Sequence, residues 1–217
     1  MRRKLGVCCL VLGICCILCA VGFVLYNKSQ ASRAADASEQ LLVDVQEQII
    51  ASVQNSVEES VSPDVESPDA EEPSLEDSAA AAPKEMLTAK VDGYDCIGVL
   101  SIPVLELELP VLTPWSYAKL KVAPCLYYGN CYEPDFVIAA HNYQSHFGRL
   151  SQMQAGDIIL FTDIEGNVHY YEVVLLETLP ANATKEMITS GFDLSLYTCT
   201  TGGAGRVTLR CSRVTCV

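Results

Sequence analysis

Apolar and polar residues are distributed differently in three successive segments of the chain. The first segment contains an uncharged, mostly apolar run from Leu5 to Leu25. At a rise of about 1.5 Å per residue, a helix of this length crosses the roughly 30 Å hydrocarbon core of a bilayer. The run therefore predicts a transmembrane helix over residues 5–26, preceded by a cytoplasmic tail of residues 1–4.

The charges that flank the apolar run predict its orientation. Arg2, Arg3 and Lys4 precede the run, whereas only Lys28 and Arg33 follow it closely. Because positive residues gather on the cytoplasmic side of membrane spans, we expect the N-terminus in the cytoplasm and the remaining chain outside the cell membrane. A cleaved signal peptide is the alternative, but its apolar region is usually only about 7 to 15 residues long.

The second segment, residues 27–90, is polar, with 14 acidic and 4 basic residues and many Ser, Ala and Pro residues. Such a composition buries no core, so we expect a disordered acidic linker that holds a domain away from the membrane. Apolar residues nevertheless recur at helical spacing over residues 39–60, which predicts an amphipathic helix. A transient helix in a stalk is the preferred interpretation, and a dimerising coiled coil is the alternative. The recurring positions are Leu42, Val45, Ile49, Val53 and Val57.

The third segment, residues 91–217, holds nearly all of the aromatic residues and is the expected folded domain. Apolar and polar residues alternate over short stretches, which predicts β-strands separated by turns. Many short strands in so few residues predict an all-β, closed or nearly closed β-barrel. One or two short helices are expected, near Ser116–Leu120 and Ala183–Ser190. The predicted strands cover residues 97–102, 105–111, 136–140, 157–162, 169–176, 194–199 and 206–210.

Charge narrows the classes of function. The chain has 27 acidic and 14 basic residues, for a formal net charge of −13. Proteins that bind nucleic acids usually present a basic surface to the phosphates. Nucleic acid is therefore not an expected partner.

The eleven cysteines fall into two groups, five in the apolar run and six beyond it. An even number in an exported segment commonly indicates disulfides. Cys211 and Cys216, however, lie too far apart in an extended tail to pair without a turn. The six cysteines beyond the apolar run show no Cys-x-x-Cys or Cys-x-x-His spacing, so no structural zinc site is expected among them. A disulfide between Cys125 and Cys131 across a loop stays open as the less favoured alternative.

Candidate chemistry lies in the last two predicted strands, which flank the glycine-rich turn Thr200–Gly205 and predict a hairpin. In a paired hairpin Cys199 lies opposite Arg206, and directly opposed Cβ atoms are about 4.5 to 5.5 Å apart. Arg210 would instead lie opposite Ser195. The geometry therefore selects Arg206 as the guanidinium beside the thiol.

A nucleophilic cysteine also needs a group that accepts and donates protons. The chain contains three histidines, His141, His146 and His169. His141 follows a predicted apolar strand and opens a polar loop, a position at which active-site groups are often displayed. Each histidine taken alone is more typical of a surface or hydrogen-bonded residue. Together with Cys199 and Arg206, His141 is the candidate general acid and base.

Three segments of the chain resemble the sortase family, in the order in which the family has them. Residues 195–199, Ser-Leu-Tyr-Thr-Cys, are similar to the signature Thr-Leu-x-Thr-Cys, and residues 140–142, Ala-His-Asn, are similar to Gly-His-Asn. Residues 206–210, Arg-Val-Thr-Leu-Arg, resemble the arginine-led last strand of the family. The departures are Ser195 and Ala140, and both are small, conservative changes.

The resemblance implies a membrane-anchored transpeptidase with an eight-stranded β-barrel. Its substrates would be surface proteins with a C-terminal Leu-Pro-x-Thr-Gly-like sorting signal, and its second substrate an amine acceptor such as a peptidoglycan precursor. Cys199 would attack the carbonyl of the signal's Thr and form a thioacyl enzyme. His141 would protonate the departing amine and deprotonate the incoming one, while Arg206 would stabilise the substrate carbonyl or oxyanion. No metal or organic cofactor is implied.

Several alternatives stay open at this point. A cell-wall cysteine peptidase or amidase would use water in place of the amine, and a tethered barrel that only binds a partner would use no nucleophile. A pilin-polymerising sortase is a third alternative, but a wall-anchoring role is favoured because neither a lid segment nor a second membrane span is recognised. We expect the connection Leu179–Asp193 to recognise the sorting signal. Asp163 and Glu165 are interpreted as part of a solvated turn, with calcium binding as the alternative.

Overall fold

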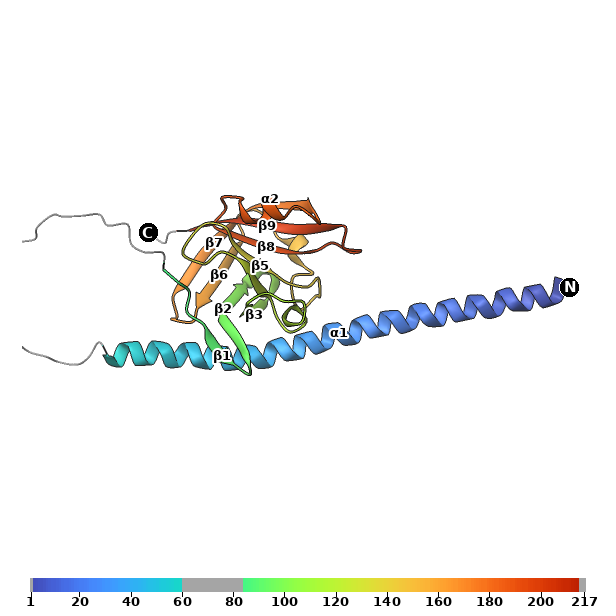
Figure 1. Ribbon diagram of the computed structural model, residues 1–217, viewed down its shortest axis with the longest axis horizontal. Coiled ribbons are helices and arrows are strands. Elements are labelled where there is room, and N and C mark those ends of the chain that lie inside the picture. Colours follow the sequence, from blue (N-terminus) through green and yellow to red (C-terminus); the bar gives the residue numbers. More distant parts are fainter. Residues whose placement is uncertain (1, 60–83, 215–217) are drawn as a thin grey trace, which may run out of the picture.

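A computed structural model of the protein describes residues 2–59 and 84–214. Within these residues the chain forms a long helix, α1 (Arg2–Glu59), a β-barrel, and a short helix, α2 (Thr184–Ile188). Figure 1 shows the barrel beside the C-terminal half of α1, while the N-terminal half of the helix extends away from the barrel.

Eight strands, β2 to β9, close the barrel of the described chain. Their order around the sheet is β2-β3-β4-β5-β8-β9-β7-β6, and β6 pairs back with β2. A short additional strand, β1 (Ala89–Val91), pairs with the first residues of β2. The predicted closed, eight-stranded, all-β barrel is therefore confirmed. Its strands are β2 (Tyr94–Ile102), β3 (Leu107–Thr113), β4 (Cys125–Tyr128), β5 (Phe136–Ala139), β6 (Ile158–Asp163), β7 (Val168–Pro180), β8 (Leu194–Cys199) and β9 (Gly205–Arg213).

The sequence pattern missed two short strands, β1 with three residues and β4 with four, which are too short for alternation to be recognised. The equally short β5 was predicted because all of its residues are apolar. The strand expected from residue 105 begins instead at Leu107, because Pro103–Leu105 forms a 3-10 turn and Glu106 takes a left-handed φ of 50°. Proline fixes the φ angle that such a turn requires at its first position.

Closure of the barrel depends on Gly98, which follows an irregularity in the pairing of β2 with β3. Gly98 has a φ of +148°, and a Cβ atom there would lie 2.1 Å from the carbonyl oxygen of Thr162 in β6. Only glycine permits so close an approach of two backbones. The same residue pairs with Asp163, so it joins the two ends of the sheet.

Two apolar clusters stabilise the described structure. The first fills the barrel interior and includes fully buried side chains such as Leu100, Phe136 and Phe161. The second lies on the outside of the barrel and is completed by one face of α1. The helix contributes Leu41, Val45 and Ile49 to this second cluster, and the barrel contributes Val91, Cys96, Val99, Leu112, Leu120, Ala123, Cys125, Ala139 and Ile164.

This second cluster corrects the expectation for residues 27–90. The part of the segment from Ala34 to Ile49 carries buried residues packed against the barrel and is not a disordered spacer. The helix expected over 39–60 is the C-terminal part of α1, and Leu41, Val45 and Ile49 on its apolar face pack against the barrel. The apolar side chains that recur at helical spacing in this segment therefore mark the face of α1 that packs on the barrel. Residues 60–83 lie outside the described residues.

The N-terminal part of α1 is a candidate membrane span. The helix contains an 18-residue window with a mean hydropathy of 2.4, and none of that window is buried against the protein. The cysteines described beyond it are free thiols, Cys125 and Cys131 included. Cys216 lies outside the described residues.

Candidate active site

The β8–β9 hairpin has the predicted register. Cys199 pairs with Arg206, and Ser195 pairs with Arg210. The Arg210 side chain is 2% exposed; its Nε donates to Glu177 Oε1 at 2.8 Å and its Nη1 to Ser195 Oγ at 2.8 Å. A buried guanidinium held by a carboxylate and a hydroxyl links three segments of the fold, so Arg210 has a structural role.

Arg206 and Cys199 occupy a different environment, because both are only half-buried. The Nη1 atom of Arg206 donates to the carbonyls of Gly203 and Gly205, at 3.3 and 3.1 Å. These two hydrogen bonds hold the guanidinium at the mouth of the hairpin, on the side of the loop that also carries Cys199. An arginine in this position can donate to an oxygen bound beside the thiol.

His141 is brought to the level of Cys199 by parallel pairing of β5 with β8. The pairing continues past the end of β5, because the Ala140 N–H donates to the Tyr197 carbonyl at 3.1 Å. The hydroxyl of Thr198 also donates to the Ala140 carbonyl, at 2.9 Å. His141 therefore follows a strand end that is fixed to β8 one residue before the cysteine.

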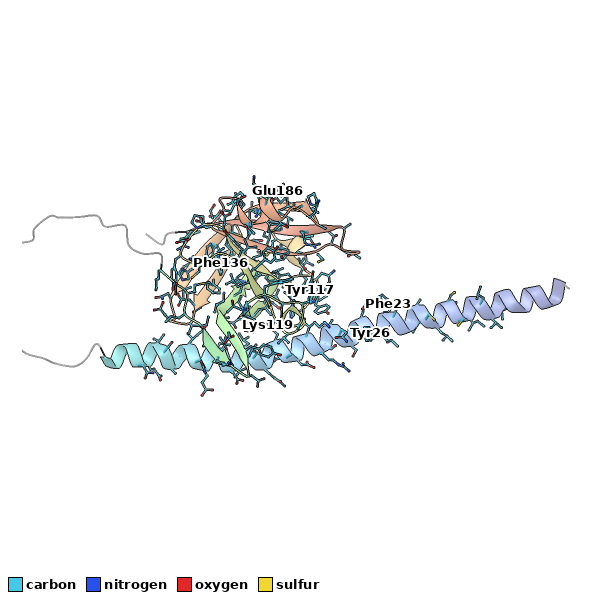
Figure 2. All side chains as sticks on the ribbon, in the orientation of Figure 1. Phe23, Tyr26, Tyr117, Lys119, Phe136 and Glu186 are labelled. Atoms are coloured by element: carbon cyan, nitrogen blue, oxygen red, sulfur yellow. The ribbon has the colours of Figure 1, made fainter. Side chains whose placement is uncertain are left out.

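The three candidate side chains, Cys199, His141 and Arg206, line one cavity of about 270 Å³. One wall of the cavity is aromatic: Trp115 makes edge-to-face contacts with Tyr117 and Tyr127, at 4.8 and 5.9 Å between ring centroids. Tyr127 continues the chain of rings to Tyr197 at 5.3 Å. Figure 2 shows Tyr117 at the end of the barrel nearest the N-terminal half of α1. The cavity is further lined by Leu120, Ala139, Ala140, Pro180, Ala181, Ala183, Thr184 and Met187.

A second cavity of about 180 Å³ lies on another side of Cys199. Its lining is mainly polar and includes Asn142, Gln144, Ser151, Thr200 and Thr201. The thiol therefore lies between an aromatic cavity and a polar one.

Burial lowers the pKa of His141 below its ordinary value of 6.5, and the positive charge of Lys121 lowers it further. The neutral imidazole therefore predominates at neutral pH. A neutral histidine in this place can accept the proton of a thiol and later return it to a leaving amine. The ring of Tyr143 lies beside it, 5.0 Å from centroid to centroid.

A second cysteine, Cys131, lies near a different histidine. Donor atoms of Cys131, Asp163 and His169 lie within 4.8 Å of one another. Burial raises the pKa of the Cys131 thiol to about 12, and the side chain is fully buried. This thiol lines neither of the two cavities described above. Its environment is that of a structural cysteine, because thiolate is the reactive form.

Asp163 organises this second group and is not part of a solvated turn, as the sequence suggested. It is 3% exposed, and its carboxylate accepts hydrogen bonds from Tyr132 and Asn167 and pairs with His169 at 3.1 Å. Burial alone would raise its pKa, but the hydrogen bonds outweigh burial and lower the pKa to about 2. The three donors Cys131, Asp163 and His169 carry no local spacing signal, since only the fold brings them together.

Residues 100–214 match the family model of the sortase domain. The match covers more than half of the 217 residues. This chain belongs to the sortase family. It is accordingly a sortase-type cysteine transpeptidase by family, with the sortase-type barrel described above. A comparison of this chain with curated protein sequences found no match.

Solved structures with a similar fold come from several sortases. Sortase A from Corynebacterium diphtheriae, a lid mutant, is 23% identical with a TM-score of 0.50, over 62% of this chain and 75% of that one. Sortase C1 from Streptococcus agalactiae is 23% identical with a TM-score of 0.50, over 55% and 68%. The sortase D5 transpeptidase from Clostridium perfringens is 18% identical with a TM-score of 0.50, over 56% and 80%. Likeness at this level shows the shared fold.

The aromatic wall of the sortase's cavity, formed by Trp115, Tyr117 and Tyr127, was not predicted from the sequence. Trp115 and Tyr117 lie in the connection after β3, and Tyr127 lies in the unpredicted strand β4. A tryptophan and a tyrosine two residues apart, outside any predicted strand, were the available signal.

Proposed function

We propose that this sortase cleaves a Leu-Pro-x-Thr-Gly-like sorting signal and transfers the new carboxyl end of the surface protein to an amine acceptor of the cell wall. Cys199 is the proposed nucleophile, His141 the general acid and base, and Arg206 the donor to the substrate oxygen. The observation that carries the proposal is the pairing of Cys199 with Arg206 in a cavity that His141 also lines.

The reaction follows from the chemistry of these three groups. The Cys199 sulfur attacks the Thr carbonyl of the signal, and its proton passes to the neutral His141. The tetrahedral oxyanion accepts hydrogen bonds from Arg206. His141 then donates the proton to the leaving Gly nitrogen as the peptide bond breaks, which leaves a thioester on Cys199. An incoming amine attacks the thioester, gives its proton through His141, and restores the thiol.

The surroundings of the cysteines favour Cys199 over Cys131. Cys199 borders two cavities that can admit a substrate from either side, while Cys131 is fully buried with a pKa near 12. A buried thiol without access cannot form a thioester with a protein chain. Cys131 is therefore a suitable control position.

The sorting signal is proposed to bind in the aromatic cavity. Its lining combines the rings of Trp115 and Tyr127 with residues of the connection Leu179–Asp193, among them Pro180 and Met187. Apolar rings facing apolar loop residues suit the Leu and Pro of such a signal. Replacing residues 179–193 by those of another sortase should change the preferred motif. An unchanged preference would remove this connection from the recognition site.

The apolar N-terminal part of α1 is proposed as the anchor, with the cytoplasmic end at Arg2–Lys4 and the barrel outside. The cluster of positive residues before the apolar run supports this orientation. The protein substrates and the acceptor would then be met at the outer face of the cell membrane.

The test uses residues 28–217, which retain the docked part of α1. This protein is incubated with a panel of fluorescent Leu-Pro-x-Thr-Gly-type peptides, with and without an amine acceptor, and the products are identified by mass. We expect cleavage between Thr and Gly and an amine-linked product. Equal amounts of a hydrolysed product with and without the amine would favour the cysteine peptidase alternative.

Single substitutions in the same assay test the proposed role of each residue. Cys199→Ala should abolish both products, while Cys131→Ala should retain them. His141→Ala should lower kcat/KM by about 10²- to 10⁴-fold, and Arg206→Ala by about 10²- to 10³-fold, as for lost proton transfer and lost oxyanion donors. Retained turnover in Cys199→Ala would refute the assignment.

A further inference from the structure

Helix α1 connects the candidate membrane span to the barrel without a break. The uncharged run ends at Leu25, and the first fully buried residue of the docked part is Ala34. Nine residues of α-helix span about 14 Å. The barrel therefore begins within about 14 Å of the point at which the helix leaves the apolar run. The long polar segment 60–83 lies after this contact in the sequence, so it does not separate the barrel from the membrane.

The contact between α1 and the barrel is a packed interface. Leu41, Val45 and Ile49 lie on one face of the helix and are at most 9% exposed. Further along, the hydroxyl of Ser52 donates to the carbonyl of Ile164 in the β6–β7 connection at 2.7 Å. An apolar stripe with a hydrogen bond at its far end fixes both the position and the rotation of the barrel on the helix.

The direction of docking places the β6–β7 turn far from the membrane span. Gly166 in this turn lies against Val53, nineteen residues beyond Ala34 in the same helix. The opposite end of the barrel carries the β8–β9 loop. In Figure 1 strand β9 starts on the side of the N-terminal half of α1 and ends near the C-terminal mark on the other side. The loop between Cys199 and Arg206 therefore points toward the membrane span.

The same end of the barrel carries residues that suit a membrane surface. Tyr117, at the edge of the catalytic cavity, is 73% exposed, and Figure 2 shows it on the side of Tyr26. Lys121 is exposed and close enough to lower the pKa of His141. Aromatic rings and lysines are favoured at the interface between lipid headgroups and water.

We propose that α1 is a rigid strut that holds the catalytic end of the barrel against the surface of the lipid bilayer in which the helix is anchored. The partner of this end is the lipid headgroup layer, which the exposed Tyr117 faces; the half-buried Trp115 packs directly against Tyr117, at 4.8 Å between ring centroids. The catalytic cavity then opens toward the membrane, and substrates anchored in the same bilayer reach it without passing around the barrel. This orientation is separate from the identity of the substrate.

The test uses intrinsic fluorescence, because Trp115 is the single tryptophan of the chain. The full chain is reconstituted in vesicles of phosphatidylcholine and phosphatidylglycerol that contain a headgroup spin-labelled lipid as a short-range quencher. The matched reporter is the double variant Trp115→Phe, Val168→Trp, because Val168 is 43% exposed at the start of β7, beside the distal turn. We expect the spin-labelled lipid to quench Trp115 several-fold more strongly than tryptophan at position 168.

Two further variants test the role of the strut. Five Gly and Ser residues inserted between Tyr26 and Asn27 interrupt the helix outside the docked part, and Val45→Asp disrupts the docked face. Both should reduce quenching of Trp115 to the level of the distal reporter, with the barrel shown to be folded by its circular dichroism. Equal quenching of the two reporters in the uninterrupted chain, or full quenching of Trp115 after the insertion, would overturn the proposal.

Discussion

Acidification should weaken the contact between α1 and the barrel through His146. This residue is fully buried, and its ring lies 5.6 Å from that of Tyr143. Neither ring nitrogen has a partner at hydrogen-bond geometry among the described residues, although the carbonyls of Ala34 in α1 and Val122 lie close enough to favour the protonated form slightly. Burial, followed by repulsion from His141, lowers the pKa of His146 from 6.5 to about 4.

The magnitude follows from the difference between the two states. The unfolded chain binds a proton at His146 below pH 6.5, whereas the folded chain binds it only near pH 4. The stability linked to this residue is therefore complete above pH 6.5 and is lost as the pH falls toward 4. At 1.36 kcal/mol per pKa unit the total loss is about 3 kcal/mol. In a domain of this size that corresponds to a decrease in Tm on the order of 10 °C.

The assay is urea unfolding of residues 28–217 at pH values from 7 to 4.5, with His146→Leu as the comparison. The wild-type free energy of unfolding should fall by about 2 kcal/mol over this range, and the variant should lose most of that slope. Asp163 does not confuse the result, because its pKa is lowered to about 2 and its contribution is lost only below pH 3.8. The same pH slope in His146→Leu would show that another group is responsible for the pH dependence of stability.

Three further predictions concern the site and the docked helix. Lys121 helps to lower the pKa of His141, so Lys121→Met should move the acid limb of the pH profile of kcat/KM upward toward pH 6.5. An acid limb that stays in place would argue against His141 as the base. Arg210→Met should lower the free energy of unfolding by about 1 to 3 kcal/mol because it removes the hydrogen bonds of a buried guanidinium to Glu177 and Ser195, whereas Arg206→Met should lower kcat and leave Tm nearly unchanged. Leu41→Ala should cost about 2 to 5 kcal/mol in urea unfolding, and a loss below 0.5 kcal/mol, roughly the effect of a surface substitution, would show that α1 does not pack there.

The sequence predicted the barrel because its strands are amphipathic or wholly apolar over at least four residues and are bounded by turns. The β8–β9 register could be predicted as well, since the glycine-rich turn fixes which residues face each other. The docking of α1 could not be predicted in the same way. Its stripe of Leu41, Val45 and Ile49 shows that one face needs a partner, but the partner residues lie far away in sequence, between Val91 and Ile164.

The candidate site, like the fold, could be predicted from the sequence only in part. Cys199, His141 and Arg206 carry recognisable neighbours in the chain, so their proximity could be expected. The aromatic wall and the group around Asp163 depend on closure of the barrel, which brings β3, β4, β6 and β7 into contact with residues far away in sequence. Side chains that meet only through closure leave no periodic or spacing signal.

The mass of the enzyme during turnover identifies directly the residue that carries the acyl group. Residues 28–217 are mixed with a Leu-Pro-x-Thr-Gly-type peptide without an amine acceptor, quenched in acid, and digested for peptide mapping. We expect an acyl adduct that ends at the Thr of the signal and maps to Cys199. An adduct on Cys131, or cleavage of the peptide that persists in Cys199→Ala, would contradict it.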